Sequence, residues 1–218
     1  MTTQRQNVLQ NNMGIWLRTD EREEVLKTLS ACRDFLKKVH EDKSYWKWVF
    51  ISLHNAIQGA MVVALRRTDG FGPIREDIEK KWYKKYRETG ESGPINEKLM
   101  NFPDLYEKIK REETLQWTSV TAYKPPSNQD WAMKKLNSIR NEFIHFTPKG
   151  WSLELSGAPG ICFSVLDIPK FLVANCSAFG IYPGHSSEDF SMELSQIEES
   201  LNVLERKYAE QGAGANGD

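Results

Sequence analysis

Residues 48–65 read WVFISLHNAIQGAMVVAL, and this stretch decides the fold. Apolar side chains occupy nearly every side of a helix formed by these residues, which is typical of a helix buried in a protein core. We therefore predict that residues 42–68 form the central helix of a bundle. Gly59 and Ala60 would let a neighbouring helix approach closely, and the turn-forming residues 68–73 (TDGFGP) would end the helix.

Helical periodicity continues on both sides of this core helix. Apolar residues recur at three- and four-residue spacing through most of the chain, and Pro and Gly residues interrupt the pattern. The further helices that we predict cover residues 20–41, 74–90, 95–112 with a break near Phe102 and Pro103, 128–147, 166–179 and 186–208. The segment 114–127 between them is expected to be a loop.

Two short runs differ from this helical pattern. Residues 151–155 alternate between apolar and polar side chains, and residues 161–165 form a second strand-like run. The turn-forming residues 157–160 separate them. We therefore expect a small β-hairpin near 150–165, followed by a helix with Pro169 in its first turn.

The composition is that of a soluble globular protein. The chain has 218 residues, of which 39% are hydrophobic and 27% charged, and this is enough for one domain with a substantial core. We predict an all-α bundle over residues 13–210, with a disordered tail over 211–218. No uninterrupted apolar run approaches the roughly 18 residues of a membrane span, and the polar residues 1–12 lack the apolar segment of a secretory signal. A cytoplasmic protein without membrane contact is therefore expected.

The residues that usually bind metals show no suitable spacing. Cys32, Cys162 and Cys176 form an odd set, which is typical of reduced thiols in a cytosolic protein. The four histidines lack the spacing of a metal site. The sequence contains no Gly-rich phosphate loop. We expect neither a structural metal nor a cofactor.

Charge is distributed unevenly along a chain whose net charge is −1. Residues 66–87 carry eight basic and four acidic side chains, with aromatic residues among the lysines, whereas residues 184–218 carry eight acidic and two basic ones. A basic segment with interleaved aromatic residues can follow a phosphate backbone and stack on bases. Lys81, Lys84 and Lys85 are therefore candidate RNA contacts. The alternative is a solvated helix face with extended lysine side chains.

The hexapeptide RNEFIH, from Arg140 to His145, places an arginine, an amide and a histidine within two turns of one predicted helix. Arginine is a permanent cation whose planar donors suit phosphate, and histidine exchanges a proton near neutral pH. Asn141 and His145 share a helix face, whereas Arg140 and His145 are roughly 140° apart. The three residues are candidates for phosphoryl transfer without a metal. The alternative is structural: Arg140 pairs with Glu142 or Asp130, and His145 caps the helix end.

A second polar group interrupts the apolar core helix. His54 and Gln58 are four residues apart and share a face, and Asn55 lies beside them in the sequence. One interpretation is a buried polar cluster satisfied by hydrogen bonds. The other is support for the motif helix or contact with substrate, and on that basis His54 and Gln58 are candidate substrate-binding residues.

Arg140, Asn141 and His145 on a late helix of a helical bundle resemble the HEPN superfamily (higher eukaryote and prokaryote nucleotide-binding domain). The motif of that family is an arginine, four to six residues and a histidine, commonly with a polar residue directly after the arginine. The resemblance implies a helical domain over most of residues 20–210. For many members it also implies a metal-independent endoribonuclease, in which the RNA 2′-OH attacks the adjacent phosphorus and leaves a 2′,3′-cyclic phosphate and a 5′-OH.

The resemblance also implies a role for each motif residue. His145 would be the acid–base group or would position the attacking hydroxyl, Arg140 would stabilise charge in the transition state, and Asn141 would orient the phosphate or the histidine. Family members typically form homodimers in which two motif helices meet at one composite site. Family analogy further suggests bacterial defence or a toxin–antitoxin pair, with an antitoxin or regulatory protein as partner.

Two features of the family bear on control and on the alternative function. Some family toxins carry a tyrosine two residues after the histidine, which a partner enzyme modifies. Here that position is Thr147, so control by tyrosine modification is not expected. Many members are non-catalytic dimeric modules for protein interaction or nucleotide binding, and this is the alternative function for the chain.

Overall fold

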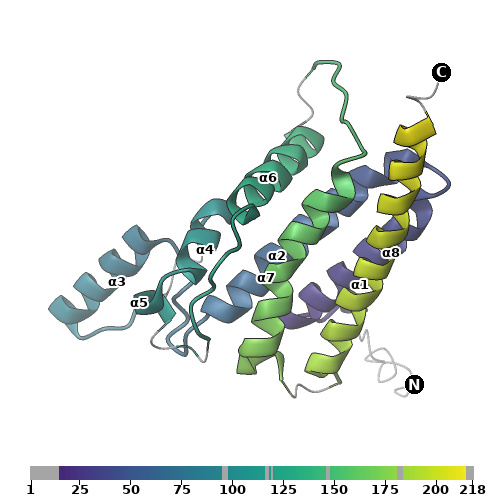
Figure 1. Cartoon of the computed structure of the whole chain (residues 1–218). Coiled ribbons are helices and arrows are strands. Elements are labelled where there is room, and N and C mark those ends of the chain that lie inside the picture. Colours follow the sequence, from purple (N-terminus) through teal and green to yellow (C-terminus); the bar gives the residue numbers. More distant parts are fainter. Residues whose placement is uncertain are drawn as a thin grey trace, which may run out of the picture.

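The chain folds into a bundle of α-helices (Figure 1). The computed structural model describes residues 15–94, 98–115, 118, 120–145, 148–180 and 184–214. Within these residues the chain forms no β-strand, and Ile74 and Leu99 make an isolated antiparallel bridge. The prediction of an all-α bundle is therefore confirmed.

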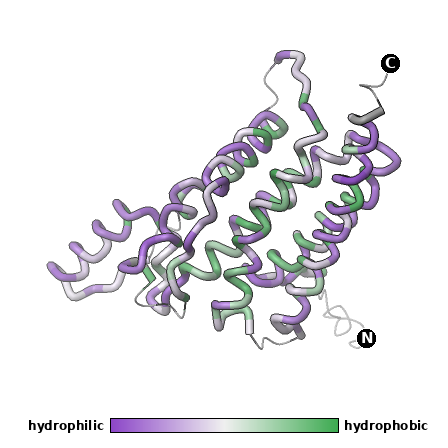
Figure 2. Tube along the Cα trace, in the orientation of Figure 1, coloured by the Kyte–Doolittle hydropathy of each residue, from purple (hydrophilic) through white to green (hydrophobic). Residues whose placement is uncertain are grey.

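The helix α2 (Trp46–Leu65), preceded by the short 3-10 helix η1 (Lys43–Tyr45), is the centre of the bundle. It packs against α1 (Glu21–Val39), α4 (Phe102–Ile109), α6 (Gln129–His145) and α7 (Ala158–Asn175). Most of its side chains are buried, from Trp46 at its start to Leu65 at its end. In Figure 2 hydrophobic residues follow the inner helices of the bundle, whereas the outlying α3 is mostly hydrophilic. The central position predicted for this helix is confirmed.

The small residue Gly59 lies where α1 and α2 approach each other closely. A Cβ atom placed on Gly59 would lie 2.7 Å from Cγ2 of Val25 on α1. This separation is far shorter than the distance of roughly 3.5–4.0 Å that carbon atoms prefer. The close approach predicted at this glycine therefore does occur, and any larger side chain would push the two helices apart.

The core helix also has the length and composition of a membrane span. Residues 43–65 are long and apolar enough to cross a bilayer, which the sequence reading had not anticipated. However, 67% of their most apolar window is buried inside the bundle. Such burial is typical of the core helix of a soluble protein, because the apolar side chains already face other helices.

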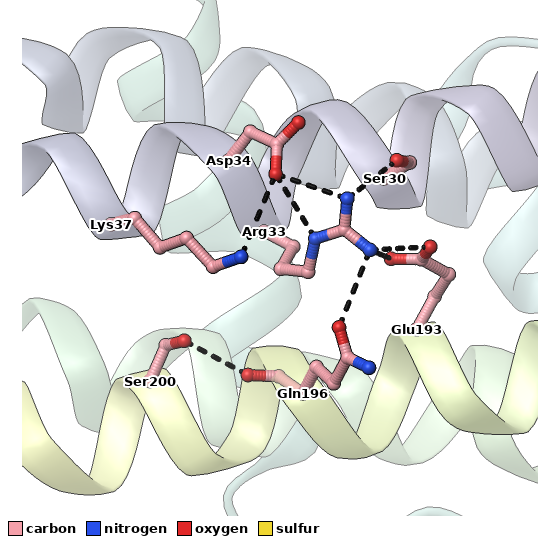
Figure 3. Close-up of polar contacts among 7 residues, drawn as sticks. All are labelled: Ser30, Arg33, Asp34, Lys37, Glu193, Gln196 and Ser200. Carbon is pink, nitrogen blue, oxygen red and sulfur yellow. Dashed lines mark hydrogen bonds and ion pairs between the residues drawn. The ribbon is translucent and has the colours of Figure 1, made fainter.

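The last helix, α8 (Ser187–Gly214), packs against α1 and α7 and follows the short 3-10 helix η2 (Ser177–Phe179). Nη1 of Arg33 on α1 donates to both carboxylate oxygens of Glu193, at 2.7 and 2.8 Å, and to Oε1 of Gln196 at 3.3 Å (Figure 3). Farther along α8, the hydroxyl of Tyr208 accepts a hydrogen bond of 2.8 Å from Nε1 of Trp46. These contacts attach α8 to both α1 and α2.

The hairpin predicted near 150–165 is wrong. Residues 151–155 form no strand, and residues 161–165 lie inside α7. A short apolar run fits a buried helix as well as a strand, and here it is packed within the bundle between α2, α6 and α8. As a result α7 already begins at Ala158, and Pro169 lies in its interior instead of its first turn.

The C-terminal end of the bundle extends beyond the predicted helix. α8 continues through Gly214, part of the way into the segment 211–218 for which the sequence indicated a disordered tail. Tyr208 is only 8% exposed, so packing against α2 holds this part of α8 in place. Residues 215–218 lie outside the part of the chain that the structure describes.

Between α2 and α6 the chain leaves the bundle. α3 (Glu76–Thr89) projects from one end of the molecule, beside α4 and α5 (Glu112–Leu115) (Figure 1). The turn into α3 requires Gly72, whose φ is 106° and where a Cβ atom would lie 1.9 Å from the carbonyl oxygen of Leu65. The break expected near Phe102 and Pro103 is the start of α4, because the Asn101 side chain caps this helix at the backbone N–H of Asp104.

Candidate functional site

The helix α6 carries the three motif residues and lies against α2, α4 and α7. Its buried side consists of Gln129, Ala132, Met133, Leu136 and Ile139. Arg140 and Asn141 lie at the edge of this side and are half-buried, whereas His145 is the last residue of the helix and is exposed. The packing of α6 thus separates the motif into a half-buried pair and an exposed histidine.

The side chain of Arg140 is bound by an amide. Nη1 donates a hydrogen bond of 3.0 Å to Oδ1 of Asn141, the next residue on the helix. Nε of Arg140 is buried and has no hydrogen-bond partner among the described residues. The guanidinium is therefore oriented by Asn141 and keeps donor capacity for a further acceptor.

The carboxylates that were candidates to neutralise Arg140 are occupied elsewhere. Glu142 forms an ion pair of 2.8 Å with Lys149. Asp130 accepts a hydrogen bond of 2.8 Å from the hydroxyl of Tyr106 and forms an ion pair of 3.4 Å with Lys110. In the described part of the chain no carboxylate pairs with Arg140. Its positive charge is therefore not compensated locally.

His145 makes no hydrogen bond or ion pair with the other two motif residues in the part of the chain that the structure describes. It is exposed at the C-terminal end of α6, and no hydrogen bond joins it to Arg140 or Asn141 within the described residues. Any site that uses all three side chains therefore needs a further surface to bring them together.

His54 joins the core helix to the motif helix. Its side chain is 1% exposed, and Nε2 lies 3.0 Å from Oδ1 of Asn137 on α6. The imidazole stacks on Phe102 of α4 with ring centroids 3.9 Å apart and an angle of 22° between the planes. This burial favours a supporting role over direct contact with substrate. Gln58, one turn later on α2, is half-buried.

Burial keeps the imidazole of His54 neutral. Desolvation is the main cause that lowers its pKa from 6.5 to about 4, and the positive charge of Arg140 lowers it further. The hydrogen bond with Asn137 and the nearby amide of Asn55 act in the opposite direction and are outweighed. At neutral pH an uncharged ring therefore lies beside the Arg140 guanidinium.

Asn137 is a residue of this cluster that was not predicted from the sequence. It lies four residues before Asn141, so the two amides share one face of α6. This spacing was visible in the sequence, but nothing in the sequence linked Asn137 to His54, 83 positions earlier. The structure thus brings together His54, Asn137, Arg140 and Asn141 and leaves His145 apart from them.

The three lysines predicted to contact RNA lie far from this cluster. Lys81, Lys84 and Lys85 are exposed on α3, at the opposite end of the bundle from the end of α6 that leads into α7 (Figure 1). On the same helix, Trp82 and Tyr86 stack with ring centroids 5.4 Å apart and an angle of 11° between the planes. This surface can contact a polyanion, but it does not adjoin the motif within one copy of the chain.

The main cavities of the described residues also lie away from the motif. One cavity of about 680 Å³ opens between the start of α3 and α4, and an adjoining one of about 560 Å³ lies along α3. Lys108, only 6% exposed, lines both, and carboxylates and cations occur in both walls. Neither cavity includes Arg140, Asn141 or His145.

The three thiols and the metal-ligating side chains form no further reactive centre in the described ranges. No group of three His, Cys, Asp or Glu side chains is placed there to hold a metal ion. Cys32, Cys162 and Cys176 are buried and form no disulfide. Burial raises the pKa of Cys32 to about 12 and that of Cys162 well above its usual value, so these two remain neutral thiols and poor nucleophiles.

Comparison with known proteins gives no match for this chain: no protein-family model, no curated protein and no solved structure is similar to it.

Proposed function

We propose that the protein is a metal-independent endoribonuclease of the HEPN type that acts as a homodimer. The observation that carries this proposal is the state of Arg140, a half-buried guanidinium whose partner is the amide of Asn141 and not a carboxylate. A cation held in this way keeps its charge for a phosphate group. An arginine with a purely structural role would more commonly have a carboxylate beside it.

In the proposed reaction the RNA 2′-OH loses a proton, and its oxygen attacks the adjacent phosphorus. The new bond to the 2′ oxygen forms as the bond to the 5′ oxygen breaks, which gives a 2′,3′-cyclic phosphate and a 5′-OH. His145 transfers the protons, one away from the attacking hydroxyl and one to the leaving oxygen. Arg140 stabilises the additional negative charge on the pentavalent phosphorus, and Asn141 orients the guanidinium.

A second copy of the chain is needed to complete this site. Arg140 and His145 lie roughly 140° apart around α6, and no hydrogen bond joins them among the described residues. Two copies that pair through α6 would place the exposed histidine of one near the arginine of the other. The exposed side of α6 also carries Trp131, which is 60% exposed, and Lys134. An aromatic residue of this exposure is common at protein interfaces.

The cellular setting follows from family analogy alone. We propose RNA as the substrate, contacted in addition by Lys81, Lys84 and Lys85, and a cytoplasmic location without membrane contact. A role in defence or as the toxin of a toxin–antitoxin pair, with an antitoxin or regulatory protein as partner, is part of the same proposal. Thr147, where some family toxins have a modified tyrosine, lies outside the described residues.

One observation favours the alternative function. The main cavities of the described chain do not include the motif, as expected for a non-catalytic dimeric HEPN-type module that binds a protein partner or a nucleotide. In that case Arg140 would bind a phosphate group without any cleavage. Tight binding of a mononucleotide without RNA turnover would distinguish this function from the nuclease.

The test is RNA cleavage in the presence of EDTA. Purified wild-type protein is incubated with labelled single-stranded RNA beside Arg140→Ala and His145→Ala, and the ends of the products are identified. We expect cyclic-phosphate ends from the wild type and a loss of at least about a hundredfold in rate for each variant. His40→Ala, which removes another exposed histidine at the end of a helix, is the matched control and should cleave like the wild type. Equal cleavage by wild type and His145→Ala would mean that the site is wrongly assigned.

A further inference from the structure

A polar contact crosses the apolar interface between α2 and α6. His54 lies between Leu53 and Ile57 on α2, most of whose side chains are buried, and Nε2 of His54 is 3.0 Å from Oδ1 of Asn137. The ring of Phe102 from α4 covers the imidazole at 3.9 Å. Stacking on Phe102 of α4 fixes the plane of the imidazole, and the contact with Asn137 of α6 fixes the direction in which Nε2 points.

Arg140 lies one turn beyond Asn137 on α6, near enough to His54 for its charge to act on the imidazole. Because Nε2 faces an amide oxygen, it carries the ring proton, and Nδ1 is left as an acceptor. Nδ1 makes no hydrogen bond of ordinary geometry with the described residues, and neither does the buried Nε–H donor of Arg140. The cluster thus contains a buried ring nitrogen on α2 and a buried guanidinium N–H on α6.

We infer that His54 and Asn137 form a neutral bracket that positions Arg140, with His54 as a positioning residue for the phosphate-binding guanidinium. This inference rests on the proposed function for the identity of the anion that Arg140 binds. The bracket fixes the height and rotation of α6 against α2, and the uncharged ring adds no second positive charge near Arg140. A cationic side chain in place of His54 would repel the guanidinium and turn it away from Asn141.

Stability alone does not explain this polar pair. A buried hydrogen-bonded pair contributes little more to folding than two apolar side chains of similar shape, although removal of one partner is costly. A purely structural role therefore predicts that leucine at both positions would serve equally well. A positioning role predicts that the same double replacement keeps the fold and changes Arg140.

The test compares His54→Leu/Asn137→Leu with the wild type. The NMR signal of the Arg140 Nε–Hε group, assigned with Arg140→Lys, reports the orientation of the guanidinium without any need for activity. We expect this signal to shift or broaden in the double variant, while the midpoint of urea unfolding is retained. With labelled single-stranded RNA, kcat should fall about a hundredfold and KM should change less than about threefold. The single variant His54→Gln keeps a neutral donor for Asn137. Its Arg140 Nε–Hε signal and its kcat should therefore be much closer to the wild type than those of the double variant.

Tyr208→Phe is the matched control. It removes another buried side-chain hydrogen bond of α2, from Trp46 to α8, and should leave the Arg140 signal and kcat unchanged. An unaltered Arg140 signal in the folded double variant would overturn the inference. If the leucine pair does not fold, the same shift is expected in Asn137→Ser, and its absence there would also overturn it. A shifted signal in a protein whose wild type cleaves no RNA would support the bracket and reject the nuclease.

Discussion

At the scale of single residues, His54 lies in an environment far from that of a histidine in water. The side chain of His54 is 1% exposed and stacks on an aromatic ring. Protonation is costly there, because the charged imidazolium would have little contact with water. The nearby charge of Arg140 adds to this cost. The folded protein therefore holds His54 neutral, whereas the unfolded chain lets it titrate normally.

This difference predicts a dependence of stability on pH. The pKa of His54 is about 4 in the folded chain against 6.5 for the ordinary group, so between these values the unfolded state binds more protons. The stabilisation is complete above about pH 6.5 and is lost as the pH falls towards 4. Urea unfolding should show the wild type losing about 2–3 kcal/mol more than His54→Gln between neutral pH and about pH 4.5.

The control for this measurement is His40→Gln, which removes an exposed histidine. It should follow the wild-type pH dependence. Parallel curves for wild type and His54→Gln would contradict a buried neutral imidazole at this position.

The sequence identified most residues of the candidate cluster but not how they meet. Arg140 and Asn141 follow from their spacing on one helix, and His54 from its place in an apolar stretch. The contact between His54 and Asn137 depends on how α2 and α6 pack, and local periodicity carries no information about the rotation of one helix against another. The sequence also could not reveal that Glu142 forms an ion pair with Lys149, whereas Arg140 donates a hydrogen bond to the amide of Asn141.

At the scale of elements, the contact between α1 and α2 depends on one missing side chain. Glycine inside a helix costs about 1 kcal/mol relative to alanine. Gly59 is nevertheless favoured, because a Cβ atom there would lie 2.7 Å from Val25. The intrinsic preference for helix and the packing of two helices are therefore opposed at this position.

We predict that the effect of Gly59→Ala changes sign with the residue at position 25. In the wild type the substitution should destabilise the fold by about 1–2 kcal/mol, since the added methyl group overlaps Val25. In a Val25→Ala background it should stabilise the fold by about 0.5–1 kcal/mol, because the overlap is gone and the helix propensity improves. A double-mutant cycle by urea denaturation measures this coupling, and additive effects would show that the two helices separate freely.

The helices with long periodic patterns were predictable, and those with short patterns were not. The apolar stretch of α2 and the repeating apolar residues of α1 extend over many turns, so each defined its helix clearly. The run of residues 161–165 covers little more than one turn. It is helical because it packs against the surrounding helices as part of α7. Tertiary packing thus determined the start of α7, where local sequence allowed either a strand or a helix.

At the scale of the whole molecule, a composite site predicts complementation between inactive variants. Arg140→Ala and His145→Ala proteins should each be inactive alone as homodimers. After mixing and subunit exchange, heterodimers would retain one arginine and one histidine from opposite copies, and cleavage of RNA should reappear at a substantial fraction of the wild-type rate. Activity is measured on the mixture, with each variant alone as the control. A mixture as inactive as its components, although exchange is confirmed by mass spectrometry of the dimers, would exclude a site shared between two copies.

The contacts between the first and last helices have a consequence for the synthesis of the chain. Arg33 meets Glu193 across 160 positions, and Trp46 meets Tyr208 across 162. On a ribosome α1 and α2 emerge long before α8, and the apolar surfaces that α8 covers stay open in the meantime. Because of this late closure, we expect the nascent chain to bind chaperones that recognise exposed apolar helices. The order in which the helices are synthesised therefore affects how much of the nascent chain aggregates before the bundle is complete.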